Sequence, residues 1–181
     1  MIPPFNLSQV LPPFIGASAT ERDGMSPFEA SVSEVVNRFA TSTERAEILE
    51  GLLNYREEMR NIGIVSGYQW IAGSFCENCE TIRGRAPADV DVVTFAYRPV
   101  ADFTQWVALF LANRQTFDPA SIKQRFKADA YYIDLGKDSD IVVADTAYFG
   151  GLFSHQRNSH LWKGMIKIPL ASDDAAARAL L

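Results

Sequence analysis

The chain has 181 residues, of which 48% are hydrophobic and 22% are charged, and its formal net charge is −5 at pH 7. These values are ordinary for a globular domain and exclude the disordered, collagen-like and disulfide-dense classes of protein. The length predicts one domain. Because Asp and Glu outnumber Lys and Arg, the chain lacks the basic footprint of a protein that binds duplex nucleic acid without sequence preference.

The start of the chain and its cysteines indicate a compartment. The first residues form neither a positively charged segment nor an apolar one, so they do not resemble a signal peptide. The apolar run Trp106–Ala112 is too short to span a bilayer, and Cys76 and Cys79 are too few for a disulfide framework. We therefore expect a cytoplasmic protein with no membrane partner.

Residues 1–25 are predicted to form an extended N-terminal strap, because Pro-Pro-Phe occurs twice there and prolines interrupt regular hydrogen bonding. We expect its large apolar side chains to pack on the chain's own domain. A helix is then predicted from Ser26 to about Phe39, since Ser26 can cap it, Pro27 suits its first position and Glu29 completes a capping box.

The rest of the chain alternates between helical and extended patterns. A second helix is predicted between a cap at Thr41 and Gly63, from the spacing of its apolar residues. Runs of β-branched and aromatic residues predict strands, while helical spacing predicts three further helices. The strands are Tyr68–Ala72, Val90–Tyr97, Ala128–Leu135 and Met165–Ile168, and the helices are 101–113, 118–126 and 139–153. The end of the chain, residues 171–181, is predicted to be a frayed or weakly helical tail.

The most informative motif is Asp89-Val90-Asp91, which opens the second predicted strand. Since side chains alternate along a strand, both carboxylates face the same side, roughly 6–7 Å apart. Like charges at that distance destabilise a fold unless a proton or a cation separates them. Mg²⁺ binds through one or two carboxylates and through substrate phosphates, so the motif favours a magnesium-dependent site.

A third carboxylate and a glycine turn complement this motif. Asp129 lies near the start of the third strand, whereas Asp134, five positions later, faces the opposite side of an unbulged strand. Gly73 and Ser74 follow the first strand. A glycine there lets the backbone approach a phosphate closely, and the serine hydroxyl and the following N–H groups can donate to it.

This arrangement resembles the polymerase-β-like nucleotidyltransferase superfamily, and a small bacterial group within it. The segments that carry the resemblance, over roughly residues 1–170, are Ile2-Pro3-Pro4-Phe5-Asn6, Leu11-Pro12-Pro13, Gly73-Ser74-Phe75, Asp89-Val90-Asp91-Val92-Val93, Asp129-Ala130-Tyr131 and Phe149 to Ile168. The resemblance implies an α/β (α+β) nucleotidyltransferase fold over residues 26–170, with a small mixed sheet flanked by helices. Members move a nucleoside monophosphate from an NTP to a hydroxyl group, using Mg²⁺.

The same resemblance assigns roles to the candidate residues. Asp89 and Asp91 would hold Mg²⁺ or Mn²⁺, and Asp129 would complete the site and help activate the acceptor hydroxyl. Gly73 and Ser74 would bind the triphosphate, with ATP as the expected nucleotide. The acceptor would be an RNA end, a protein side chain or a small hydroxyl compound.

Several cationic residues are candidates for assisting phosphate or nucleic-acid binding. Arg83 and Arg85 could reach the triphosphate, because guanidinium groups suit phosphate oxygens, although solvated loop arginines explain them equally well. The basic and aromatic segment 155–167, which includes Lys163, could hold a nucleotide or an RNA end, or could simply connect a helix to a strand. Lys123 and two neighbouring cations lie near a helix end, where the helix dipole is sufficient explanation.

Two alternatives remain. Cys76, Cys79, His155 and His160 have zinc-ligand spacings, but seventy-five residues separate the two pairs, so reduced loop cysteines are the favoured interpretation. The second alternative concerns function: the chain would be a catalytically weak or inactive nucleotidyltransferase-like module. It would bind a partner protein encoded nearby, as in a toxin–antitoxin or phage-defence pair.

Overall fold

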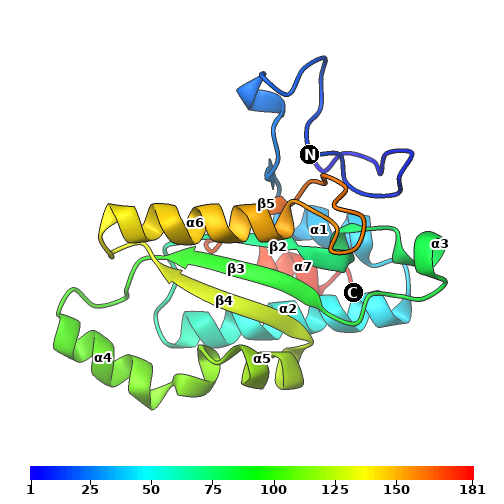
Figure 1. Cartoon of the computed structure of the whole chain (residues 1–181). Coiled ribbons are helices and arrows are strands. Elements are labelled where there is room, and N and C mark those ends of the chain that lie inside the picture. Colours follow the sequence, from blue (N-terminus) through cyan, green and yellow to red (C-terminus); the bar gives the residue numbers. More distant parts are fainter.

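The computed structural model describes residues 1–181 and shows a five-stranded mixed sheet with helices on both faces (Figure 1). The strand order is β1-β5-β2-β3-β4. The strands are β1 (Phe28–Glu29), β2 (Gly67–Ala72), β3 (Val90–Ala96), β4 (Ala128–Asp134) and β5 (Ile166–Pro169). The prediction of an α+β protein with a small mixed sheet flanked by helices is therefore confirmed.

Seven α-helices and three short 3₁₀ helices complete the chain. The α-helices are α1 (Val32–Phe39), α2 (Thr43–Asn61), α3 (Cys79–Arg83), α4 (Phe103–Ala112), α5 (Pro119–Phe126), α6 (Ser139–Phe153) and α7 (Asp174–Arg178). The 3₁₀ helices are η1 (Arg22–Gly24), η2 (Gly73–Cys76) and η3 (Arg114–Thr116). None of these helices combines the length and the hydrophobicity that crossing a lipid bilayer would require.

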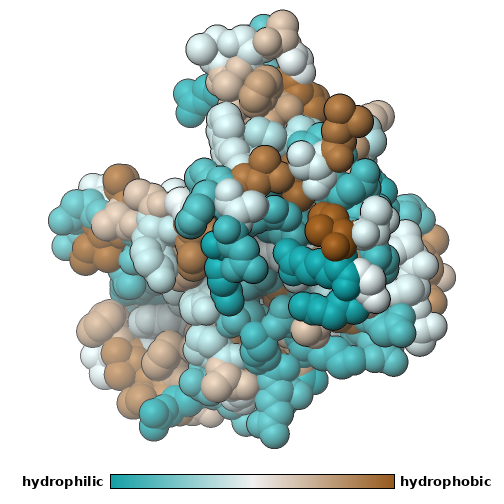
Figure 2. Space-filling model, turned by 45° about the vertical axis from the view of Figure 1, so that its right-hand side comes forward, coloured by the Kyte–Doolittle hydropathy of each residue, from teal (hydrophilic) through white to brown (hydrophobic).

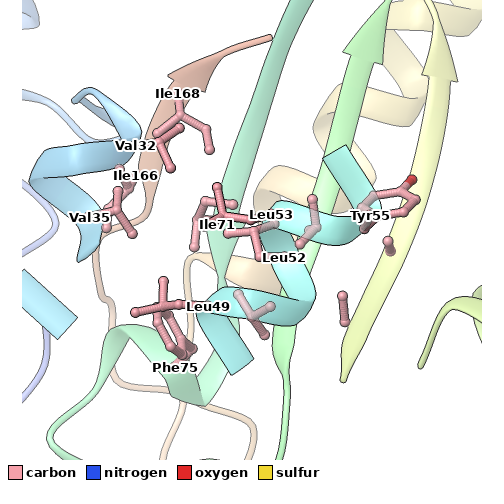
Figure 3. Packing of buried hydrophobic residues seen from close by; sticks show 14 of the residues in the cluster. Val32, Val35, Leu49, Leu52, Leu53, Tyr55, Ile71, Phe75, Ile166 and Ile168 are labelled. Carbon is pink, nitrogen blue, oxygen red and sulfur yellow. The ribbon is translucent and has the colours of Figure 1, made fainter. Parts of the chain in front are cut away.

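The two faces of the sheet are covered unequally. On one face α2 packs with α1 and the strands in a cluster of 27 buried residues, which includes Leu52 and Ile71 (Figure 3). On the other face α6 covers a cluster of only seven buried residues, which includes Val93 and Phe153 (Figure 1). Because Asp91 and Val93 are two residues apart on β3, the Asp91 side chain projects to the thinly covered α6 side.

The predicted helix over 26–39 is wrong in its first part. Residues 28 and 29 form β1 instead, which pairs in parallel with β5 and gains backbone hydrogen bonds there. Helix α1 begins only after Ser31, whose side chain accepts from the Glu34 N–H while the Glu34 carboxylate accepts from the Ser31 N–H. A second capping box downstream therefore sets the start of the helix. The other predicted helices and strands are confirmed to within two residues at each end.

The tail predicted to be frayed or weakly helical contains the short helix α7, which is held by charged contacts. The Asp173 carboxylate accepts hydrogen bonds from the backbone N–H groups of Val32, at 3.0 Å, and Ser33, at 3.3 Å. Asp174 pairs with the guanidinium group of Arg56 at 2.8 Å. Helix α7 is thus docked against α1 and α2.

The N-terminal residues run outside the sheet and are partly buried. Val10 and Leu11 are fully buried, and the ring of Phe5 packs against that of Phe39 with 6.2 Å between centroids. The segment that contains η1 projects from the top of the molecule in Figure 1. Several apolar residues of the segment 1–25 therefore pack on the chain's own domain, as predicted, whereas Leu7 is fully exposed.

The register of the sheet brings the motif residues together. β3 runs antiparallel to β2 and parallel to β4. Asp91 lies beside Ala72 at the end of β2 and beside Asp129 at the start of β4. The turn at Gly73, the start of β3 and the start of β4 consequently meet at one end of the sheet.

Candidate functional site

Three aspartates lie at the end of the sheet where β3 and β4 begin. Asp89 directly precedes β3, Asp91 is its second residue, and Asp129 is the β4 neighbour of Asp91. The ammonium group of Lys123 on α5 joins two of them, because its Nζ lies 2.6 Å from Asp89 Oδ2 and 3.2 Å from Asp129 Oδ2. The structure thus gathers the three predicted carboxylates and adds one cation to them.

Asp91 has no such partner. Its carboxylate is partly buried, accepts no hydrogen bond and pairs with no cation. Burial raises the pKa of Asp91 to about 6, and the negative charges of Asp89 and Asp129 act in the same direction. The charges of Lys163 and Lys123 lower the pKa of Asp91 but do not offset these effects, so at neutral pH Asp91 is mostly ionised and its charge is only partly compensated.

Gly73 lies directly against Asp91. Its φ is +72°, and a Cβ atom at this position would lie 1.5 Å from Asp91 Oδ2. Both the backbone conformation and the close approach require glycine. Ser74 follows as the second residue of η2. The turn thus places partly buried backbone next to the Asp91 carboxylate.

Lys163 is almost fully buried, and its side chain contacts this turn from within the fold. Its Nζ donates to the Gly73 carbonyl and to Glu77 Oε1, each at 2.7 Å. Arg83 donates to the other oxygen of Glu77 at 2.6 Å, whereas Arg85 donates only to a neighbouring backbone carbonyl. Of the predicted phosphate-binding cations, Lys163 and Arg83 are therefore engaged with Glu77, and Arg85 is not brought to the site.

Tyr131 adds an aromatic wall to the site. It follows Asp129 by two residues and shares its face of β4. Burial raises the pKa of Tyr131, and the charge of Asp129 raises it further. The ring packs against Phe149 of α6 with 5.0 Å between centroids.

From Tyr131 a hollow of about 490 Å³ extends along the outer edge of β4, between α4 and α6. Its aromatic lining residues are Trp106, Phe110, Phe117, Tyr131, Tyr132 and Phe149. This volume is large enough for a drug-sized ligand or a few side chains of a partner. We refer to it below as the edge groove.

The segment 155–167 makes contacts within the chain. The ring of Trp162 packs against that of Phe14, with 6.0 Å between centroids, and residues 155 and 162 form an isolated antiparallel bridge. His155 contacts Ser154 through Nδ1, at 3.0 Å. These contacts fit the interpretation of the segment as a helix-to-strand connection.

The cysteines are also explained without a metal ion. Both are buried, and their thiols donate to the backbone carbonyls of Ile71, at 3.4 Å from Cys76, and Ser74, at 3.1 Å from Cys79. Burial raises the pKa of Cys76 to about 12, so its thiol stays protonated. The favoured interpretation of reduced cysteines agrees with these contacts.

The carboxylates match a divalent cation in chemistry but do not converge on one point. Hard oxygen ligands and an excess of negative charge are what Mg²⁺ requires, and Asp89, Asp91 and Asp129 supply both. However, no group of three or more His, Cys, Asp or Glu side chains is close enough to hold a metal ion in this arrangement. Asp89 and Asp129 are instead bridged by Lys123.

Sequence reasoning missed three residues of this site. Tyr131 could have been found, because a residue two positions from Asp129 shares its face of the strand. Lys123 was attributed to the helix dipole, and no local pattern shows that it reaches across to Asp89. Glu77 lies in a loop whose burial depends on the strap and on Lys163, so no periodicity marks it.

A family model described as a family of unknown function, DUF6932, matches residues 3–169. No curated protein and no solved structure matches the chain.

Proposed function

The chain belongs to this family of unknown function, and from its own site we propose that it is a metal-dependent nucleotidyltransferase of the cytoplasm. It would move a nucleoside monophosphate from an NTP, ATP first, to a hydroxyl group. The acceptor would be an RNA end, a protein side chain or a small hydroxyl compound. Mg²⁺ or Mn²⁺ would be held by Asp89, Asp91 and Asp129 and would screen the charge of the phosphates.

In this reaction an acceptor oxygen attacks the α-phosphorus of the nucleotide. A new P–O bond forms, the bond to the bridging α–β oxygen breaks, and pyrophosphate leaves with the electron pair. Asp129, at the more exposed edge of the site, would accept the hydroxyl proton. The backbone of the Gly73 turn, held by Lys163, would position the triphosphate beside the carboxylates.

The observation that carries the proposal is the unpaired carboxylate of Asp91. A partly buried, ionised group with two like charges beside it costs stability, and the fold supplies it with no hydrogen bond. The Gly73 turn is shaped to lie against it. Such an arrangement is typical of a site that a cationic ligand completes.

The test is label transfer. The purified protein is incubated with α-labelled NTPs, Mg²⁺ or Mn²⁺ and candidate acceptors, and transfer of label is measured. Asp89→Ala and Asp91→Ala are expected to abolish it. Asp134→Asn is the matched control, because Asp134 lies at the other end of β4 and pairs with Arg98. Label transfer that persists in both alanine variants would contradict the proposal.

A second candidate is a binding module without catalysis, and the edge groove favours it. β4 is an edge strand, so one side of its backbone is free to pair with a partner's strand. Apolar side chains on both flanking helices are exposed: Phe103 and Leu111 on α4 by 63% and 57%, and Val143 and Tyr148 on α6 by 66% and 64%. In Figure 2 hydrophobic, brown atoms gather at the lower left, the side where Figure 1 places α4.

Calorimetry separates the two candidates. The module is supported if the protein shows no Mg²⁺-dependent NTP binding but binds the product of a neighbouring gene tightly, as expected for a toxin–antitoxin or phage-defence pair. Phe110→Ser, in the groove, should then weaken that binding, whereas Tyr97→Ser, exposed at the end of β3, should not. Unchanged binding with Phe110→Ser would exclude the groove as the contact.

A further inference from the structure

Three cations lie at the C-terminal end of α5, two in the helix and Lys127 directly after it, and each pairs with at least one carboxylate. Arg125 pairs with Glu58, and Lys127 pairs with Glu47 at 2.5 Å, so both fasten α5 to α2. Lys123 points the other way, to Asp89 and Asp129 at the end of the sheet. Lys123 is thus the member of this set that enters the candidate site.

The position of Lys123 Nζ is informative. It lies between two carboxylate oxygens that belong to different elements, 2.6 Å from one and 3.2 Å from the other. A cation bridging two carboxylates is the same arrangement that a divalent ion adopts between hard oxygen ligands. Asp91, which the ammonium group does not reach, remains unpaired.

The Lys123 side chain is free to leave without disturbing the fold. It is 50% exposed, and its ammonium group is held only by the two carboxylates. The helix itself stays fixed, because Ile122 is fully buried and the pairs of Arg125 and Lys127 hold α5 to α2. Rotation about the side-chain bonds of Lys123 would therefore carry the charge into solvent and open the space between Asp89 and Asp129.

We propose that Lys123 is an internal cation that occupies the space of a divalent metal ion between Asp89 and Asp129 and is exchanged for that ion. This rests on the proposed metal-dependent function and adds a regulation of the same site. Without metal the single charge of the lysine is shared between two of the three carboxylates. When the ion binds, the lysine swings out, and the carboxylates can converge. Lys123 thus lowers the affinity of the site for a free metal ion. An ion that arrives bound to a nucleotide is therefore favoured over a free ion.

The test measures metal binding directly, without turnover. Mn²⁺ is titrated into the full chain, and the free ion is followed by electron paramagnetic resonance for the natural protein, Lys123→Met and Lys127→Met. Lys127 is the matched control, because both side chains are 50% exposed and both pair with a carboxylate. We expect Lys123→Met to lower the Kd for Mn²⁺ by about fivefold to tenfold, and Lys127→Met to leave it unchanged.

A second readout guards against a folding defect. Thermal unfolding of Lys123→Met is expected to begin lower than that of the natural protein without metal, and to rise further when Mn²⁺ is added. Lys123→Gln keeps a polar side chain of similar length and replaces the methionine variant if that variant does not fold. It should likewise bind Mn²⁺ more tightly than the natural protein.

The outcomes distinguish the exchange of Lys123 for a metal ion from the proposed metal-dependent function. Equal Mn²⁺ affinity in the natural protein and both Lys123 variants would overturn the exchange but leave the metal-dependent function standing. Weaker affinity in the variants would also overturn it, since Lys123 would then assist the ion. No Mn²⁺ binding by any of the proteins would overturn the metal site itself, and with it the proposed function.

Discussion

The fold contains two clusters of charged groups that differ in how their charges are balanced. On the α2 face, Arg56 is 1% exposed and donates to Asp174 with two nitrogens at 2.8 Å and to Gln69 at 2.6 Å, and it also donates to two backbone carbonyls. Arg60 adds a third hydrogen bond to Asp174. Donors and acceptors in this cluster match.

At the end of the sheet the balance is different. Asp89, Asp91 and Asp129 bring three negative charges, and Lys123 pairs with only two of them. The first cluster joins distant elements and serves the stability of the fold. The second carries negative charge that the fold balances only in part, and this difference supports the proposed cation site.

The largest effect is expected from breaking the hydrogen-bonded cluster around Arg56. Arg56→Met would leave the carboxylate of Asp174 and the amide of Gln69 buried with too few partners, so the free energy of unfolding should fall by about 3–5 kcal/mol. Urea denaturation measures this change. Arg60→Met is the control, because Arg60 is 36% exposed on its side chain and binds the same Asp174, and it should cost at most about 1 kcal/mol. Equal losses of unfolding free energy in both variants would show that burial of a guanidinium group does not determine how much it contributes to stability.

A smaller loss is expected from Gly73→Ala, which forces a side chain against Asp91. The positive φ alone costs an alanine roughly 1–2 kcal/mol, and the overlap with Asp91 should bring the total to about 2–3 kcal/mol. Gly84→Ala is the matched control, because Gly84 also has a positive φ, +63°, but has nothing within 4 Å of an added Cβ. The excess loss at Gly73, measured by thermal and urea unfolding, reports the contact with the carboxylate. If both glycines gave the same loss, the close approach would be unimportant.

The strands and most helices could be predicted from the sequence because their signals are local. The alternation around Asp89 and Asp91 placed both on one face of a strand, and the same rule separated Asp129 from Asp134. The structure agrees: Asp134 pairs with Arg98 at the far end of β4. The start of α1 was missed because the sequence offers two capping boxes. The pairing of β1 with β5 decides between them, and these strands are more than a hundred residues apart in the sequence.

The partners of the site residues could not be predicted, because they depend on three-dimensional contacts between charges. Nothing near Lys123 in the sequence shows that its side chain reaches Asp89 rather than solvent. The same holds for Lys163: its segment is predicted either to hold a nucleotide or RNA end or to connect a helix to a strand, and only the structure shows that its ammonium group pairs with Glu77. Asp174 lies in a segment predicted to be frayed or weakly helical, and only the position of Arg56 shows what holds it.

The comparison of the two clusters is tested most sharply by a variant that should stabilise the protein. Asp91→Asn removes the charge that the fold leaves unpaired. The pKa of Asp91 is raised from 3.8 to about 6 in the folded protein, so the folded state binds more protons than the unfolded state between these values. Stability of the natural protein therefore decreases as the pH rises through this range.

The gain from Asp91→Asn should consequently depend on pH in a defined way. At pH 8 and without divalent metal, the variant is expected to be more stable than the natural protein by about 1–2 kcal/mol, less than the full linkage value because the carboxylate is partly hydrated. Near pH 4 the difference should vanish, because Asp91 is then protonated in the folded state. Asp134→Asn, which breaks a short ion pair with Arg98, should destabilise the protein at pH 8. If Asp91→Asn instead lowered stability at pH 8, the carboxylate would have a partner within the fold, and the contrast between the two clusters would be lost.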